Sequence, residues 1–421
     1  MPTDDAVIIT ALRTPVGRAR GQFASLPAWT LGEIVVREAV ARAGIDPADY
    51  DDVILGETIG GGGNAGRYIG LAAGIPREVP GFTVIRACAT GLEAVTQAAL
   101  NVWAGTGDAY VAGGCESMSQ QPWLMRKPSQ PYPRKPPESF IPLTHPLEMG
   151  PFSVGLNTGE NVAEKYGVTR EDQDQWAYRS HMRAINAIDN GYFKREIVPV
   201  DVNGMMVETD EHPRRDTTLE KLAKLPPVYK QGGTVTAGNA SGMNDAGAAV
   251  IVASARKAAA LGLTPRARIV AWCSVGVDPN ITGSAPIEAV PKVLKRAGLT
   301  LDDIDLIEIN EAFAAMTVAC VRELGLDEEK TNVNGGAIAL GHPVGATGAR
   351  LVTSLLHELE RRDGRYGIVT MCAGGGLGSA AVIEGSEDGV PDRHRRRGNL
   401  HRLPRRRLEG RLLALEASHD A

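Results

Sequence analysis

The sequence predicts an α/β protein made of two related halves. Helix-like stretches alternate with short apolar runs along most of the chain, which is typical of parallel strands covered by helices. The same order of elements occurs twice, which indicates an internal duplication. The chain has 421 residues, 43% hydrophobic and 23% charged, as expected for a globular protein. This composition excludes a disordered chain, a coiled coil and a collagen-like repeat.

The first sign of duplication is a helix end followed by a turn and a strand. Residues 39–57 read AVARAGIDPADYDDVILGE, and residues 293–311 read VLKRAGLTLDDIDLIEINE, 254 positions later. In both copies an Arg-Ala-Gly triplet predicts a helix that ends at glycine, at Gly44 and at Gly298. An acidic turn and a buried strand follow in each copy.

A second pair of segments follows in the same order. Ala-Thr-Gly occurs at 89–91 and again at 346–348, 257 positions later, and a helical run follows each copy. The strands after these helices also correspond, so that Cys115 coincides with Cys372. Ordered matches at a nearly constant offset therefore predict two related α/β halves.

The segment between the halves has a different character. Residues 121–151 contain nine of the 26 prolines, which predicts an irregular loop. Residues 156–200 then show a helical pattern. We expect this insertion to lie over one half and to act as a lid over a substrate.

Charge and cysteine content restrict the classes of function. The formal net charge of -5 argues against nucleic acid as a general partner. No apolar run of about 18 residues is present, so no membrane span is expected. The five cysteines show neither a disulfide framework nor metal-ligand spacing, so we expect free thiols, no bound metal and a cytoplasmic location. Residues 385–421 carry nine arginines and no lysine, which is typical of a disordered basic tail, with anion binding as the alternative.

Cys88 is the first candidate for chemistry. It lies at an expected strand-to-helix turn and is followed by the small residues Ala89, Thr90 and Gly91. At the N-terminus of a helix, the helix dipole lowers the pKa of a thiol and favours the nucleophilic thiolate. The alternative interpretation is a small buried apolar side chain, as most free cysteines are.

His342 is the second candidate. It stands among small or chain-bending residues in Gly341-His342-Pro343-Val344-Gly345, at a helix start that corresponds to the position of Cys88 in the first half. A Cys/His pair is the usual arrangement of a nucleophile and the base that activates it. A core histidine bonded to the backbone is the alternative.

Three further candidates follow strands of the second half. Cys372 ends an expected parallel strand, at the edge where open α/β sheets bind ligands. The glycines after it, among them Gly374, allow backbone N–H groups to approach a ligand closely. A second cysteine without metal-ligand spacing can act as a general acid or base. Asn310 ends another strand with an amide that can orient a water or an oxyanion, and a simple turn residue is the alternative.

Together these motifs resemble those of the thiolase family, the acetyl-CoA C-acyltransferases. The resemblance runs from about residue 5 to residue 384, and its strongest marks are 113–119, 239–242, 310–314, 334–337, 341–343 and 372–376. It implies a duplicated fold of five αβαβα layers with an inserted loop domain. The domains implied are an N-terminal half at 1–119, an inserted loop or lid region at 120–245, a C-terminal half at 246–384 and a tail at 385–421.

The resemblance also implies a role for each candidate residue. Cys88 is similar to the acyl-accepting nucleophile, His342 to the residue that activates it, and Cys372 to the acid/base. His342 and a water on Asn310 would form one oxyanion site, and the backbone N–H groups of Cys88 and Gly374 a second. Contacts with coenzyme A (CoA) are expected at Ser241, Arg214, Tyr229, Ala312 and Phe313.

The reaction implied is the CoA-dependent thiolytic cleavage of a 3-oxoacyl-CoA to acetyl-CoA and a shortened acyl-CoA, or the reverse Claisen condensation, through an acyl group on Cys88. CoA and acyl-CoA are expected as substrates, with no permanently bound cofactor, in fatty acid metabolism and β-oxidation. A homodimer or homotetramer is also implied. The chain has Thr90 where the family usually has Ser, and Met149-Gly150 earlier than the family's His-Met-Gly, which leaves the acyl chain length open.

Two other functions are compatible with the same fold. A ketosynthase-type condensing enzyme would not need Cys372, which this chain contains. A non-catalytic carrier of acyl-CoA or lipid would be expected to lose catalytic residues, whereas Cys88, His342 and Cys372 are all present.

Overall fold

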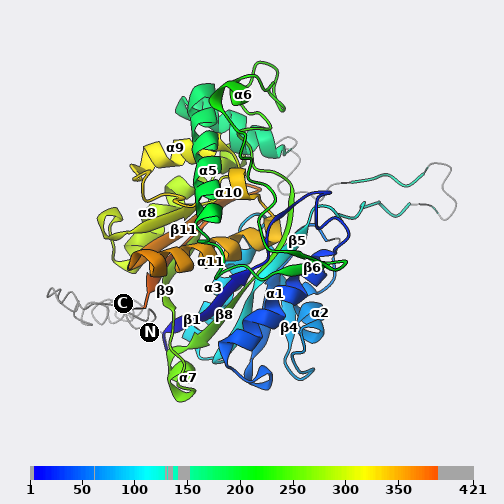
Figure 1. Cartoon of the computed structure of the whole chain (residues 1–421), viewed down its shortest axis with the longest axis vertical. Helices are drawn as coiled ribbons and strands as arrows, with labels where there is room; N and C mark the ends of the chain where they lie inside the picture. Colours follow the sequence, from blue (N-terminus) through cyan, green and yellow to red (C-terminus); the bar gives the residue numbers. More distant parts are fainter. Residues whose placement is uncertain (1–3, 61, 129, 131–135, 141–151, 387–421) are drawn as a thin grey trace, which may run out of the picture. The chain divides into compact units, whose positions relative to one another are not determined.

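The computed structural model describes residues 4–60, 62–128, 130, 136–140 and 152–386, which lie within one compact unit, Met1–Gly389. The predicted tail beyond residue 386 and Met149-Gly150 lie outside the described residues. Helices and strands alternate along both halves, as Figure 1 shows by its colours.

One large sheet of ten strands runs through the described part of the chain, in the order β10-β11-β12-β9-β1-β8-β5-β3-β4, with β2 beside β8. The two halves of the sheet join where Val7 and Ile8 of β1 pair with β9. The strands are β1 Ala6–Arg13, β2 Gly17–Arg18, β3 Asp52–Gly56, β4 Gly81–Val84, β5 Ala109–Ser117, β8 Asn244–Ser254, β9 Ala267–Gly276, β10 Leu306–Ile309, β11 Tyr366–Ala373 and β12 Leu377–Gly385.

The sheet is mixed rather than parallel. Strand β3 pairs in parallel with β4 and β5, and β10 with β11, as the alternation of strands and helices predicted. The strands β1, β8, β9 and β12 pair antiparallel with their neighbours, so the expectation of parallel sheets is wrong for them. The reason is local for β12, because only residues 374–376 separate it from β11, and a short turn can join only antiparallel strands.

The helices and the two halves of the sheet stack in five layers. Helices α3 and α11 lie between the two half-sheets, and their apolar side chains form one core with strands of both halves (Figure 1). Helices α1 and α2 pack on the outer face of the first half, and α8 and α9 on that of the second. This arrangement confirms the αβαβα order. The helices are α1 Ala28–Ala43, α2 Ala65–Ala72, α3 Thr90–Ala104, α7 Ala255–Ala260, α8 Ala285–Ala297, α9 Ala314–Leu324, α10 Ala337–Leu340 and α11 Val344–Arg362.

The two halves repeat each other in local geometry. Helix α1 ends at Gly44 with φ 71°, and α8 ends at Gly298 with the same φ of 71°. This left-handed conformation favours glycine, which explains the repeated Arg-Ala-Gly triplet. A short 3₁₀ turn follows each glycine, at Pro47–Asp49 and at Leu301–Asp303, and leads into β3 and β10. The predicted duplication is therefore confirmed.

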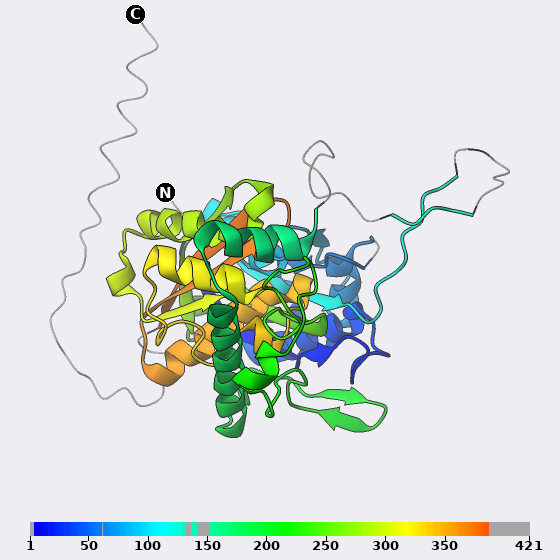
Figure 2. The same ribbon diagram turned by 90° about the horizontal axis from the view of Figure 1, so that it is seen from above.

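The insertion has two parts with different positions. Residues 122–128 and 136–140 form an arm that extends away from the sheet in both views (Figures 1 and 2), with Met125 bridged to Ser139. The helical part, from residue 156 onward, packs on the second half through side chains such as Trp176. Its elements are the π-helix Leu156–Glu160, α4 Asn161–Tyr166, α5 Arg170–Asp189, β6 Val200–Val202, β7 Met205–Val207 and α6 Leu219–Ala223. A 3₁₀ helix at Pro279–Ser284 belongs to the second half, where it follows β9. The described part of the arm extends away from the sheet, and its role as a lid stays a prediction.

The division of the chain into domains stays a proposal. Strand β8 runs across the boundary expected between residues 245 and 246, and it pairs with β5 and β1 of the first half. We therefore propose that the first half ends after α7 and not at residue 245. In the described ranges, no helix has the length and apolar character needed to cross a membrane.

Candidate active site

Cys88 lies in a tight turn between β4 and α3. The preceding Ala87 has φ 44°, a left-handed conformation that is costly for a residue with a side chain. The turn is held because Thr90 Oγ1 accepts the Arg86 N–H at 2.7 Å, and Ala89 N donates to the Arg86 carbonyl at 3.0 Å. The hydroxyl at position 90 thus shapes the turn that carries Cys88, and threonine supplies it as serine does.

The electrostatics of Cys88 differ from the sequence expectation. Burial raises the pKa of its thiol to about 11, and the negative charge of Glu116 acts in the same direction. Backbone hydrogen bonds from Gly374 and from Cys88 itself lower the pKa without overcoming burial. The expectation that the helix N-terminus yields a thiolate is wrong, because desolvation of the charged form outweighs the dipole. Cys88 is a thiol at neutral pH and needs a base.

Gly374 lies in the turn between β11 and β12. Its backbone bond to Cys88 brings the Cys372 strand end to the Cys88 turn. Gly375 and Gly376 have φ of 88° and 78°, so the turn requires glycine at both positions. Gly376 N also donates to Thr282 Oγ1 at 2.9 Å, which fixes the turn against the 3₁₀ helix Pro279–Ser284. The N–H of Gly374 is therefore held in place before any substrate binds.

Cys372 is fully buried at the end of β11, and its Sγ lies 3.5 Å from Met316 Sδ of α9. Burial raises the pKa of the Cys372 thiol well above its usual range, and the Cys88 thiolate would raise it further. The charge of Cys88 acts on Cys372, and a Cβ added at Gly374 would lie 3.7 Å from Ala87 Cβ, so the segments that carry the two thiols lie side by side. The structure therefore brings Cys88, Gly374 and Cys372 together, and both cysteines are neutral at pH 7.

His342 is buried just before α11, within reach of two polar side chains. Its Nδ1 lies 2.7 Å from Thr347 Oγ1, and its Nε2 lies 3.4 Å from Asn310 Nδ2. Burial lowers the pKa of His342 to about 3, helped by the positive charge of Arg350, so the imidazole is neutral at pH 7. A neutral ring offers one nitrogen that accepts a proton. Asn310 and His342 are thus brought together as expected.

Among the described residues, no hydrogen bond joins Cys88 directly to His342; Glu116 links their surroundings. Glu116 Oε2 accepts the N–H of Gly345 at 2.9 Å and contacts Thr58, and its charge acts on Cys88. Catalytic hydrogen bonds are often long before substrate binds. This geometry is therefore compatible with both roles expected of His342, namely activation of Cys88 and formation of an oxyanion site. Burial raises the pKa of Glu116 to about 7.

Two buried residues that sequence analysis missed hold the His342 and Asn310 segments. Asn244 Oδ1 accepts the His342 N–H at 3.0 Å, and its Nδ2 donates to the Gly17 carbonyl at 2.9 Å. Glu311, next to Asn310, accepts hydrogen bonds from the side chains of Trp176, Ser180 and Asn332. Glu311 lies inside the motif at 310–314, whereas Asn244 lies two residues after the motif at 239–242. The available signal was therefore a position in or next to a motif, and the role of each residue needed the fold.

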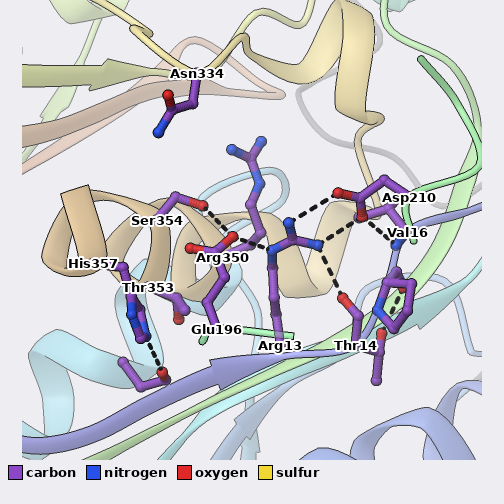
Figure 3. A network of polar contacts seen from close by, with 12 residues as sticks. Arg13, Thr14, Val16, Glu196, Asp210, Asn334, Arg350, Thr353, Ser354 and His357 are labelled. Carbon is purple, nitrogen blue, oxygen red and sulfur yellow. Dashed lines mark hydrogen bonds and ion pairs between the residues drawn. The ribbon is translucent and has the colours of Figure 1, made fainter. Parts of the chain in front are cut away.

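A buried ion network links β1, the insertion and α11 (Figure 3). Arg13 Nε contacts Glu196 at 2.7 Å, and its Nη1 contacts Asp210 at 2.7 Å. Arg350 of α11 is also buried, and Glu308 at 3.7 Å is its ion-pair partner. Its positive charge is one cause of the low pKa of His342. The network thus joins β1, the insertion and α11, and its Arg350 acts electrostatically on His342.

The residues expected to contact CoA lie in one region. Ser241 N donates to the Ala312 carbonyl at 3.0 Å, and Tyr229 packs edge-on against Phe313 with ring centroids 5.9 Å apart. Arg214 lines a cavity of about 130 Å³ together with His181, His212 and the neighbour of Ser241, Ala240. Burial lowers the pKa of His181 to about 4 and that of His212 to about 3, so both are neutral at pH 7.

No metal centre is evident: in the described ranges, His, Cys, Asp and Glu side chains form no group of three or more that could hold a metal ion. The site is therefore a pair of buried thiols, a neutral imidazole and fixed N–H donors at the ends of sheet strands. Such a set suits nucleophilic acyl transfer by a cysteine.

Comparison with known proteins places the chain in a class and then in a family. Residues 6–256 match the family model "Thiolase, N-terminal domain", and residues 263–385 match "Thiolase, C-terminal domain". The chain therefore belongs to the thiolase family and is an acyltransferase.

Three relatives illustrate the similarity. An acetyl-CoA acetyltransferase of Syntrophomonas wolfei subsp. wolfei is 46% identical, covering 91% of this chain and 99% of the relative. A 3-ketoacyl-CoA thiolase of Bacillus subtilis is 44% identical, covering 90% and 99%. The crystal structure of human mitochondrial 3-ketoacyl-CoA thiolase in complex with CoA superposes with a TM-score of 0.86 at 39% identity, covering 91% of this chain and 98% of that one.

Proposed function

We propose that the protein catalyses CoA-dependent thiolytic cleavage of a 3-oxoacyl-CoA, and the reverse condensation of two acyl-CoA molecules, with the acyl group carried on Cys88. One observation supports this most strongly. The Gly374 N–H bonds to Cys88, and Cys372 is close enough for its thiol to feel the charge of Cys88. This proximity supports the proposed roles of Cys88 as nucleophile, of Cys372 as proton donor and of the Gly374 N–H as a donor to a developing negative charge.

The first half-reaction forms the acyl-enzyme. The neutral His342 takes the proton of the Cys88 thiol, and the sulfur attacks the 3-keto carbon of the substrate. The N–H groups of Cys88 and Gly374 stabilise the oxygen that becomes negative, and loss of one such donor costs about 2.7–4 kcal/mol of barrier. When the C2–C3 bond breaks, its electron pair stays on C2 of the acetyl-CoA enolate. Cys372 gives its proton to that carbon, and acetyl-CoA leaves.

The second half-reaction transfers the acyl group to CoA. The Cys372 thiolate takes the proton of the CoA thiol, and the CoA sulfur attacks the thioester on Cys88. Cys88 leaves as a thiolate and recovers its proton from the His342 imidazolium. All three residues return to the neutral forms that their burial favours. Run backwards, the same steps join two acyl-CoA molecules by a Claisen condensation.

The proposal is tested by thiolysis of 3-oxoacyl-CoA substrates of increasing chain length, with loss of the 3-oxoacyl-CoA followed over time. We expect activity that disappears in Cys88→Ala and an acyl adduct on Cys88 in the wild type, detected by mass spectrometry after rapid quenching. Cys273→Ala is the matched control, because Cys273 is a buried thiol of the C-terminal core and its replacement should leave full activity. Inactivity on every chain length, or an adduct on another residue, would contradict the proposal.

CoA and acyl-CoA are the proposed substrates at Ser241, Arg214, Tyr229, Ala312 and Phe313, with no permanently bound cofactor. The Arg214 side of the cavity suits the phosphates of the nucleotide end, and the aromatic pair suits the pantetheine arm. We also propose a role in fatty acid metabolism and β-oxidation and a cytoplasmic location. The acyl chain length is left to the thiolysis series.

We further propose that the protein is a homo-oligomer in which β4 faces a second copy of the chain. Strand β4 ends the described sheet, so one of its edges has no neighbour. The surface around this edge carries apolar side chains that are exposed by 38–69%, namely Tyr68, Leu71, Phe82, Ile85 and Leu100. An apolar open edge favours pairing with another strand. Light scattering is expected to give at least a dimer for the wild type and a smaller species for Ile85→Asp; an unchanged mass contradicts this interface.

The two alternative functions are less well supported. A ketosynthase-type condensing enzyme gives no role to Cys372, although its thiol is coupled to Cys88. A non-catalytic carrier gives no role to the N–H groups fixed around Cys88. Failure of thiolysis together with tight acyl-CoA binding would favour the carrier.

A further inference from the structure

Thr347 makes two short contacts through a single hydroxyl. Its Oγ1 lies 2.8 Å from the carbonyl oxygen of Pro343, one helical turn earlier, and 2.7 Å from Nδ1 of His342. Thr347 is fully buried in the first turns of α11, so water does not compete for these contacts. Each contact requires a proton between its two heavy atoms.

The positions of these protons follow from counting. The carbonyl of Pro343 can only accept, so the Thr347 hydroxyl must supply the proton of that contact. That proton is the only one the hydroxyl has. The contact with His342 therefore needs its proton on Nδ1, which donates to Thr347 Oγ1. If Nδ1 were unprotonated, one of the two contacts would set lone pairs against each other at less than 3 Å.

The other side of the ring cannot decide the tautomer. Asn310 Nδ2 lies 3.4 Å from His342 Nε2, and Asn310 Oδ1 has no partner. Turning the Asn310 amide over would present its oxygen to the ring instead, so Asn310 fits either protonation state of Nε2. The contacts of Thr347, in contrast, are compatible with only one tautomer of neutral His342, the one with its proton on Nδ1.

We propose that Thr347 is a positioning residue that holds the proton of neutral His342 on Nδ1 and so keeps the lone pair of Nε2 free to accept the proton of Cys88. This inference rests on the proposed function for its catalytic consequence, although the tautomer itself does not. When Cys88 loses its proton, Nε2 gains it, and Nδ1 continues to donate to Thr347. The hydroxyl therefore stabilises the ring before and after the transfer without moving.

The same helix offers a matched control. Thr353, also fully buried, donates from Oγ1 to the Ala349 carbonyl at 2.9 Å, which repeats the contact of Thr347 with Pro343. It makes no contact with His342. Replacement of either threonine by valine removes a hydroxyl from a buried helix position at constant shape, so general effects on folding appear in both variants.

The test uses Thr347→Val, Thr347→Ser and Thr353→Val in the full chain. Nitrogen-15 NMR of labelled histidine assigns the protonated nitrogen of His342 in the resting enzyme, with His342→Asn to identify its signals. Thiolysis kinetics are measured on the same samples. We expect Nδ1–H in the wild type, in Thr347→Ser and in Thr353→Val. In Thr347→Val we expect loss of the pure Nδ1–H state and a fall in kcat of about 100-fold, the size of a general-base contribution.

The outcomes separate this inference from the proposed function. A wild-type His342 with its proton on Nε2, or a Thr347→Val variant with unchanged NMR signals and kcat, overturns the role of Thr347. Equal losses of kcat in Thr347→Val and Thr353→Val also overturn it, because they indicate a structural effect. An Nδ1–H tautomer that Thr347→Val abolishes, in a wild-type protein without thiolysis, supports the positioning role and contradicts the function alone.

Discussion

Glu116 Oε2 accepts the backbone N–H of Gly345 at 2.9 Å, and this bond ties strand β5 of the first half to helix α11 of the second. The same carboxylate accepts hydrogen bonds from the backbone of Thr58 and Ile59. His342 lies three residues before Gly345, so the carboxylate fixes the start of the helix that carries the proposed base.

We therefore expect Glu116→Gln to impair both folding and thiolysis. The amide of glutamine places N–H groups against N–H donors, and each buried donor left without a partner costs about 1–3 kcal/mol. Urea unfolding should show this loss, and kcat should fall because the His342 segment shifts. Glu78→Gln, at an exposed position of the first half, is the control. Wild-type stability in Glu116→Gln would show that the carboxylate does not hold α11.

The reactivity of Cys88 should increase with pH well beyond neutrality. Its pKa of about 11 means that the thiolate fraction of the free enzyme continues to rise from pH 7 to pH 10. Alkylation by iodoacetamide, followed on the Cys88 peptide by mass spectrometry, should accelerate throughout this range. A rate that levels off near pH 7 would instead indicate a thiolate at rest, as the helix dipole alone predicts.

Met316 should stabilise the fold both by its packing volume and by its sulfur contact with Cys372. Two variants can separate these contributions to the free energy of unfolding. Met316→Leu keeps the volume but removes the Sδ that faces Cys372, so we expect a stability loss below about 1.5 kcal/mol. Met316→Ala opens a cavity in the fully buried core and should cost about 2–5 kcal/mol. Urea unfolding measures both. If Met316→Leu lowers stability as much as Met316→Ala, packing volume is not the main contribution.

Glu308 should make stability depend on pH. Burial raises its pKa from 4.5 to about 8, although the charge of Arg350 acts against this. Between these values the folded protein holds a proton that the unfolded chain has released. The contribution of Glu308 is therefore complete below pH 4.5 and declines as pH rises towards 8.

Glu308→Gln removes this titration. The free energy of unfolding of the wild type, measured relative to Glu308→Gln, should therefore fall from pH 5 to pH 8. Urea unfolding at several pH values gives this difference, and Glu329→Gln at an exposed position is the control. A difference that stays constant or rises with pH would contradict the raised pKa.

Local sequence patterns determined the repeated architecture. The Arg-Ala-Gly triplets predicted helix ends at Gly44 and Gly298, and both glycines take the left-handed conformation that only glycine adopts at little cost. The strand pattern likewise placed Cys372 and Asn310 at strand ends, and the structure puts both there. These features depend on neighbours in the sequence, so a sequence pattern can carry them.

Tertiary structure decided the charges and the partners. The helix start next to Cys88 suggested a thiolate, but burial by distant segments makes it a thiol. The antiparallel pairing of β8 with β1 and β5, and of β1 with β9, also depended on long-range packing. Thr347 and His342 are five residues apart, so their bond is local in the sequence. Glu116 and Gly345 belong to different halves, so their bond joins segments that only the fold brings together. Desolvation and contacts between halves arise only when the chain is folded. For that physical reason the sequence by itself predicted the reacting groups, whereas the fold set their protonation states.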